Sequence, residues 1–168
     1  MRFAKYFFLV LLLAGMTSQL VTAQEPDKSA YVAGATSKFQ NFPGIPKCAM
    51  ASAQRGDPSK GNAVLLLKAQ TGCMVPWHWH TPVESLMMVS GRAKVEMKDG
   101  DPVTLRPGDF VYLTAKHVHQ FTCQASCMMF DISEGAPFDI HYVDASGNEI
   151  PAEQALKSKA KPGAKKSE

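Results

Sequence analysis

The most informative stretch of this sequence, residues 72–91, reads GCMVPWHWHTPVESLMMVSG. Alternate side chains of an extended strand lie on the same face, so His78 and His80 point in one direction and the intervening Trp79 points in the other. Glu84 begins the next predicted strand and can fold back towards the two imidazoles. Two imidazoles and a carboxylate that converge on one point predict a metal site.

A third imidazole comes from residues 107–119, which predict a turn, a strand, a second turn and the start of another strand. His119 opens that last strand and shares a face with Phe121. Three imidazoles and one carboxylate would leave two positions open on a six-coordinate ion. Imidazole and carboxylate ligands together suit Fe, Mn, Ni, Cu or Zn, so we predict one divalent ion of this group. Its predicted ligands are His78, His80, Glu84 and His119.

Most of the remaining chain predicts short strands separated by turns. Turn signals stand at Ser90-Gly91, at residues 98–101 and at residues 106–109, and no segment before residue 150 has a helical period. This pattern indicates an all-β sandwich or barrel. The predicted strands are residues 63–69, 74–80, 84–90, 92–97, 103–105, 109–113, 119–123, 127–132 and 139–143.

These residues resemble the two sequence motifs of the cupin superfamily. The first motif, G-x5-H-x-H-x3,4-E-x6-G, is matched in full by Gly72, His78, His80, Glu84 and Gly91. The second motif, G-x5-P-x-G-x2-H-x3-N, is matched in part, by Gly108 and His119. Thr114, Lys116 and Cys123 stand where the family has proline, glycine and asparagine, which affects the expected turn more than the metal.

The resemblance implies a single double-stranded β-helix barrel at residues 37–150, with one metal ion near its mouth and a small-molecule ligand. It also implies that two barrels pair as a homodimer. The alternative is a cupin that keeps the ligands but serves only as a rigid domain. A looser resemblance, through residues 56–61 and 138–142, is to small exported bacterial cupins of undefined activity.

The first 23 residues predict a secretory signal peptide. Arg2 and Lys5 supply positive charge, and the apolar run at residues 7–13 is short for a membrane span. Cleavage is expected after Ala23, which would place the mature protein in the periplasm or outside the cell, without stable membrane insertion. The alternative is an uncleaved N-terminal anchor helix.

The composition of the 168 residues, 45% hydrophobic and 20% charged, favours one folded domain and excludes a multi-pass membrane protein. Residues 24–152 carry 11 basic and 13 acidic side chains, so we predict no nucleic-acid partner. Residues 24–36 are expected to form a flexible leader. Residues 151–168 are expected to form a Lys-rich disordered tail with one weak helical stretch at residues 152–161.

The four cysteines, Cys48, Cys73, Cys123 and Cys127, follow the predicted cleavage point. An even number of cysteines in an oxidising compartment favours disulfides. Residues 124–126 predict a short hairpin loop whose strands can bring Cys123 close enough to Cys127 to bond. We therefore favour this pair, which leaves Cys48 with Cys73. Free thiols and a zinc site are alternatives, although the spacing is a poor match to structural zinc sites.

No separate general acid or base can be assigned, so no catalytic residue is predicted. Tyr112 and His141 are the nearest candidates, but His141 is expected to be a surface or hydrogen-bonded histidine, and His117 is expected to be exposed in a turn. If Glu84 faces inwards, the pocket has an apolar wall formed by Leu86, Met88 and Phe121.

Three functions are compatible with this site. A metalloenzyme would chelate a small oxygen-rich molecule, with dioxygenase-like chemistry on a redox metal or isomerase-like chemistry on zinc or manganese. A metal-dependent module of the envelope would bind or sense a small ligand without turnover. A structural protein would carry a vestigial metal site. The sequence slightly favours the enzyme.

Overall fold

The computed structural model describes residues 29–157 and divides the chain into two units, Met1–Tyr31 and Val32–Glu168. The second unit holds all the described strands and helices. The predicted signal peptide, the first five residues of the predicted leader and the Lys-rich end of the tail lie outside the described residues. Within residues 29–157, no helix has the length and apolar character that a membrane span needs.

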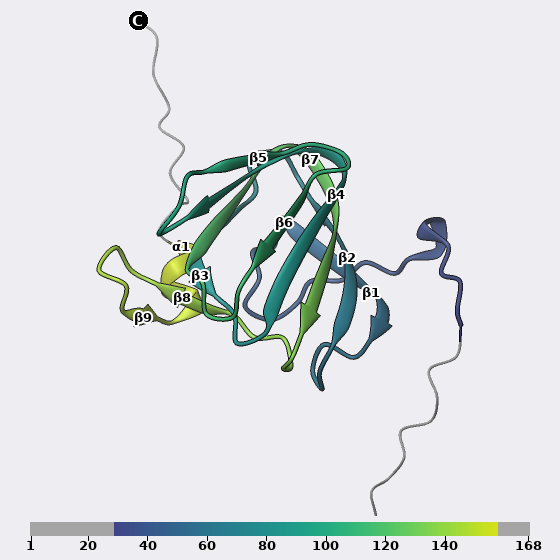
Figure 1. The fold of residues 1–168 in the computed structure, drawn as a ribbon, viewed down its shortest axis with the longest axis horizontal. Coiled ribbons are helices and arrows are strands. Elements are labelled where there is room, and N and C mark those ends of the chain that lie inside the picture. The colour runs from purple at the N-terminus through teal and green to yellow at the C-terminus, as the bar shows by residue number, and fades with distance from the viewer. Residues whose placement is uncertain (1–28, 158–168) are drawn as a thin grey trace, which may run out of the picture. The chain divides into compact units, whose positions relative to one another are not determined.

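The unit Val32–Glu168 is built mainly of strands that belong to one sheet, so the predicted all-β fold is confirmed (Figure 1). Short α1 contacts β8 and buries Ala155. The elements in chain order are η1 (Gly34–Thr36), β1 (Ala49–Gly56), β2 (Ala63–Ala69), β3 (Met74–Trp79), β4 (Val83–Met97), β5 (Val103–Leu105), β6 (Phe110–Leu113), β7 (His119–Glu134), β8 (His141–Val143), β9 (Glu149–Ile150) and α1 (Ala152–Lys157).

Two expected turns are absent because the chain passes through them as strand. Residues 84–97 form one strand, β4, and residues 119–132 belong to one strand, β7, so the predicted hairpin loop at residues 124–126 is wrong. β-bulges interrupt the pairing of β4 with β7 at these places, and a bulge absorbs the turn-like residues without ending the strand. The prediction also missed β1, whose small and polar side chains carry little strand signal.

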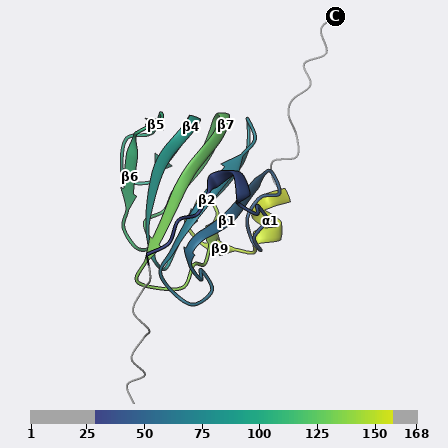
Figure 2. The same ribbon diagram turned by 90° about the vertical axis from the view of Figure 1, so that its right-hand side faces the viewer.

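The two long strands, β4 and β7, form an antiparallel ribbon that organises the barrel. They run side by side in Figure 2, with β5 and β6 on one side and β1 and β2 on the other. Val83 lies opposite Glu134 at one end of the ribbon, and Met97 lies opposite His119 at the other. A straight ribbon would separate Glu84 from His119 by about 40 Å. Their side chains are instead 3.1 Å apart, so the ribbon folds back on itself and encloses an interior.

Gly91 lies at the bend of this ribbon. Its φ is +84°, and a Cβ built there would collide with the main-chain oxygens of Ala125 and Ser126 on the facing strand. Only glycine combines this backbone conformation with such a close approach. The glycine that completes the first cupin-like motif therefore permits the bend that brings Glu84 to His119.

We expect Gly91→Ala to destabilise the domain at least twice as much as Gly108→Ala. Both glycines have positive φ, which costs an L-residue about 1–2 kcal/mol. A Cβ at position 108 meets no atom within 4 Å, whereas the collision at position 91 adds to that cost. Urea unfolding followed by tryptophan fluorescence gives both free energies of unfolding. Equal losses would contradict the close approach at Gly91.

Two disulfides hold the same end of the barrel. Cys48 is bonded to Cys73, with Cα atoms 5.6 Å apart, and Cys123 is bonded to Cys127, with Cα atoms 5.8 Å apart. This is the pairing that the sequence favoured, although Cys123 and Cys127 close a bulge inside β7 and not a hairpin loop. The N–H of Cys123 donates to the carbonyl of Cys73, so the two bridges are adjacent.

Candidate metal centre

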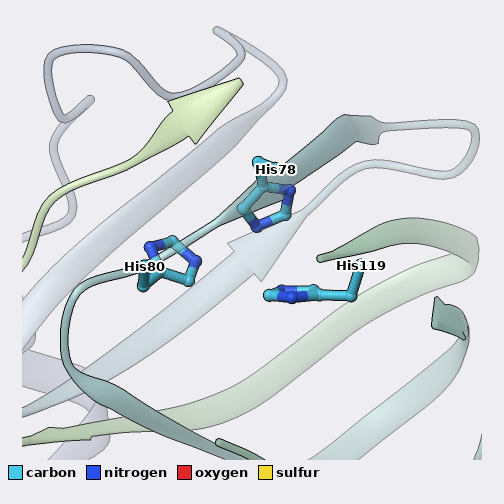
Figure 3. A group of neighbouring side chains, drawn as sticks. All are labelled: His78, His80 and His119. Atoms are coloured by element: carbon cyan, nitrogen blue, oxygen red, sulfur yellow. The ribbon is translucent and has the colours of Figure 1, made fainter. Parts of the chain in front are cut away.

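Four buried side chains meet inside the barrel, and they come from three elements and one connection. His78 lies in β3 and His80 follows its last residue, Glu84 lies near the start of β4, and His119 opens β7. Candidate ligand atoms of the three histidines lie within 4.8 Å of one another, and Figure 3 shows their rings directed towards a shared space. The period-2 spacing of His78 and His80 therefore places both imidazoles on the inner face, as predicted.

Main-chain carbonyls orient all three imidazoles. Nδ1 of His78 donates to the carbonyl of Pro76 at 2.7 Å, and Nδ1 of His119 donates to that of His117 at 2.9 Å. Nδ1 of His80 donates to the carbonyl of Asp139. A carbonyl only accepts, so each ring carries its proton on Nδ1 and keeps the lone pair of Nε2 for another partner. Second partners of this kind are typical of metal-ligating histidines.

Glu84 completes the cluster with a carboxylate. Its Oε2 lies 3.1 Å from Nε2 of His119 and 3.7 Å from Nε2 of His80. Within the described part of the chain, no group donates a well-formed hydrogen bond to this buried oxygen. Buried carboxylate oxygens are normally paired or bound to a metal. The oxygen and the three Nε2 lone pairs thus fit a divalent cation.

The electrostatics of the cluster favour a cation as well. Burial lowers the pKa of His78 well below its usual value, and the neighbouring imidazoles of His119 and His80 lower it further, so this ring is neutral. Burial opposes ionisation of Glu84, but the imidazoles of His80 and His119 outweigh it and lower its pKa to about 2. Burial also opposes charge on His119, yet the Glu84 carboxylate raises its pKa.

The cluster lines one part of a largely apolar cavity. Leu86 and Phe121 contribute to the wall, as the sequence predicts, whereas Met88 is buried outside the lining. Phe138 and Ile140, from the segment before β8, also line it, and the ring of Phe138 lies 4.9 Å from that of His80.

The sequence analysis missed one polar residue of this cavity, Asp131. It lies on the inner face of β7 with 3% of its surface exposed, and its Oδ1 has no hydrogen-bond partner in residues 29–157. Burial raises the pKa of Asp131 well above its usual value, and the charge of Glu84 raises it further. The available signal was a lone acid at an inward position of the apolar run at residues 127–132.

The two acid–base candidates considered from the sequence do not line the cavity. Tyr112 is 56% exposed on β6. His141 lies 3.2 Å from carboxylate oxygens of both Asp139 and Glu149, and it stacks on Trp79 with ring centroids 3.9 Å apart. His141 is therefore the hydrogen-bonded histidine that the sequence predicts.

The turn before His119 forms with a lysine where the family has glycine. Lys116 takes that position with φ +61°, a conformation that side chains disfavour. Its N–H donates to the carbonyl of His80 at 2.8 Å. Although Lys116 replaces the family's glycine, the turn is therefore hydrogen-bonded to His80, one of the candidate ligands.

The family model of the Cupin domain matches residues 65–133, the part of the chain that carries all four cluster residues. The domain is a cupin. Among solved structures, this cupin resembles an rmlc-like cupin protein from Ralstonia eutropha, with 23% identity, a TM-score of 0.58, and 77% of this chain and 86% of that chain covered.

Two further structures share the cupin fold. The polyketide cyclase RemF from Streptomyces resistomycificus has 15% identity and a TM-score of 0.60, with 77% of this chain and 99% of that chain covered. The DMSP lyase DddQ from Ruegeria pomeroyi has 20% identity and a TM-score of 0.52, with 67% and 68% covered. These identities establish similarity of fold alone. The comparison with curated proteins finds no match.

Proposed function

We propose that this cupin binds one divalent metal ion and uses it to chelate a small oxygen-bearing molecule in the barrel cavity. The proposed ligands are His78, His80, Glu84 and His119. The observation that carries the proposal is the set of three Nδ1–H bonds to main-chain carbonyls, which leaves three Nε2 atoms free beside a buried carboxylate. The alternative of a domain with no use for metal leaves this buried donor set without a purpose.

The proposed activity is that of a metalloenzyme with dioxygenase-like or isomerase-like chemistry. A bound ion would supply Lewis acidity and, if it is redox-active, would also permit reaction with O2. The protein itself holds the imidazoles in one tautomer, keeps Glu84 ionised and surrounds the ligand with apolar side chains that exclude water. A cyclase and a lyase among the structures of similar fold are in keeping with turnover.

The second candidate function is binding without turnover in the cell envelope. We propose export on the basis of the signal-like residues 1–23, and the two disulfides support it because such bonds persist in oxidising compartments. An envelope protein that captures a small ligand needs the same chelating centre as an enzyme. The site geometry is therefore common to both functions, and turnover separates them.

Elemental analysis of the purified protein tests the shared part of the proposal. We expect one metal ion per chain in the wild type and loss of that ion in His78→Ala. His117→Ala is the matched control, since His117 neighbours the cluster without belonging to it and should keep the metal. Failure to bind Fe, Mn, Ni, Cu or Zn, each supplied in excess, would refute the proposal. Consumption of a chelating diketone or enediol, with or without O2, would identify an enzyme.

A further inference from the structure

We propose that Asp131 recognises a hydroxyl group of the cavity's ligand. This inference rests on the proposed function, since it adds a second contact to a molecule chelated at the metal. It assigns the ligand to a class of small, mostly apolar molecules that carry two chelating oxygens at one position and a separate hydroxyl at another.

The character of the cavity supports the apolar part of this description. Among the described residues that line it, every side chain outside the four-residue cluster is apolar except Asp131. The lining includes small side chains, such as Ala49, Ala51 and Ala69, next to larger ones from β2 and β4. Such a surface favours a hydrocarbon body over a densely hydroxylated one, because unpaired hydroxyls lose their bonds to water on entry.

The position of Asp131 supports the hydroxyl. In the sheet it lies between Leu65 of β2 and Leu86 of β4. Its inward neighbours along β7 are Met129 and Ser133. Leu65, Leu86 and Met129 have no side-chain hydrogen-bond donor of ordinary strength. The hydroxyl of Ser133 does not bond to Asp131 either, because its Oγ and Oδ1 of Asp131 both lack a partner in the described part of the chain. Native domains leave few buried polar atoms unpaired, and those few often serve a ligand.

A hydroxyl satisfies this carboxyl in either protonation state, because it can both donate and accept a hydrogen bond. Glu84, the other carboxylate of the cavity, lies beside the imidazoles of the cluster and is one of the proposed metal ligands. Asp131 lies on the inner face of β7, opposite Leu86 of β4. Glu84 is two residues before Leu86 on the same strand, so both carboxyl groups face the cavity. The Asp131 carboxyl is therefore placed to form a hydrogen bond with a substituent of a ligand whose oxygens are bound to the metal.

Hydroxamates test this inference because they chelate metals through two oxygens and vary freely elsewhere. The probes are acetohydroxamate, which is the chelating head with a methyl group, and benzohydroxamates with a hydroxyl or a methyl at the ortho, meta or para position. Isothermal titration of the zinc-loaded protein gives the dissociation constants. At each ring position, the dissociation constant of the methyl compound is divided by that of the hydroxyl compound. Any effect of a substitution on the metal itself cancels in this ratio.

We expect the wild-type ratio to reach at least tenfold at one ring position, since a site built to pair a hydroxyl rejects the analogue that lacks it. Asp131→Leu and Asp131→Ala should each lose this preference, so the test survives if one variant fails to fold. Ser133→Ala, at the next inward position of β7 and outside the cavity lining, should keep it.

The outcomes separate this inference from the function on which it rests. If no probe binds, acetohydroxamate included, the proposed chelating function fails. If acetohydroxamate binds but the benzohydroxamates do not, or if the ratios are near one at every position, only the ligand class is wrong. A preference that persists in both Asp131 variants would overturn the role of Asp131.

Discussion

Zinc added to the metal-free protein is expected to raise its free energy of unfolding by about 4 kcal/mol when free zinc exceeds the dissociation constant a thousandfold. For a domain of this size, that stabilisation corresponds to an increase in melting temperature of about 15 °C. The physical reason is that folding assembles the site. Residues 78–84 and residue 119 meet only when the β4–β7 ribbon bends, so the unfolded chain offers no comparable set of ligands.

His80→Ala should remove most of this stabilisation, since it deletes a central ligand, and His117→Ala should retain it. Differential scanning calorimetry with and without zinc measures both melting temperatures for each protein. An equal effect of zinc on His80→Ala and on the wild type would mean that the metal binds elsewhere. The comparison is independent of elemental analysis, because it reports binding to the folded state only.

Local sequence patterns predict the parts of this centre that depend on neighbouring residues. Alternation along a strand places His78 and His80 on one face, and the next strand, with Glu84 near its start, returns the carboxylate to them. The turn before His119 was predicted from its residues, and it forms even though Lys116 replaces the family's glycine. Only short-range geometry was needed for these inferences.

The features that the sequence does not predict depend on contacts between distant residues. The meeting of Glu84 with His119 requires a bend at bulges that face one another across β4 and β7, and a bulge resembles a turn in the sequence. The same ambiguity split each long strand into two in the prediction. β1 was not predicted because its composition does not favour a strand. It forms a strand because it pairs with β2.

Asp131→Asn is expected to stabilise the metal-free protein, and the gain should grow as the pH rises. Burial, reinforced by the charge of Glu84, raises the pKa of Asp131 above its unfolded value. The folded protein therefore keeps a proton that the unfolded chain releases, and the associated stability is complete below about pH 4 and is lost as the pH approaches the folded pKa. Asparagine is neutral at every pH. The difference in unfolding free energy should thus increase by up to about 1.4 kcal/mol per pH unit.

Urea unfolding at about pH 4.5, 5.5, 6.5 and 7.5 measures this difference in unfolding free energy. Each step of roughly one pH unit can show the expected change of ~1.4 kcal/mol. Asp144→Asn is a control of opposite sign. Hydrogen bonds from Asn148 and Ser146 lower the pKa of Asp144, so its stabilising effect is present at neutral pH and is lost as the pH falls. A pH-independent difference for Asp131→Asn would show that the carboxyl has a stabilising partner in the folded state. If the difference in unfolding free energy grows with pH, then Asp131 destabilises the fold. That result is expected of a residue that is retained because it binds a ligand.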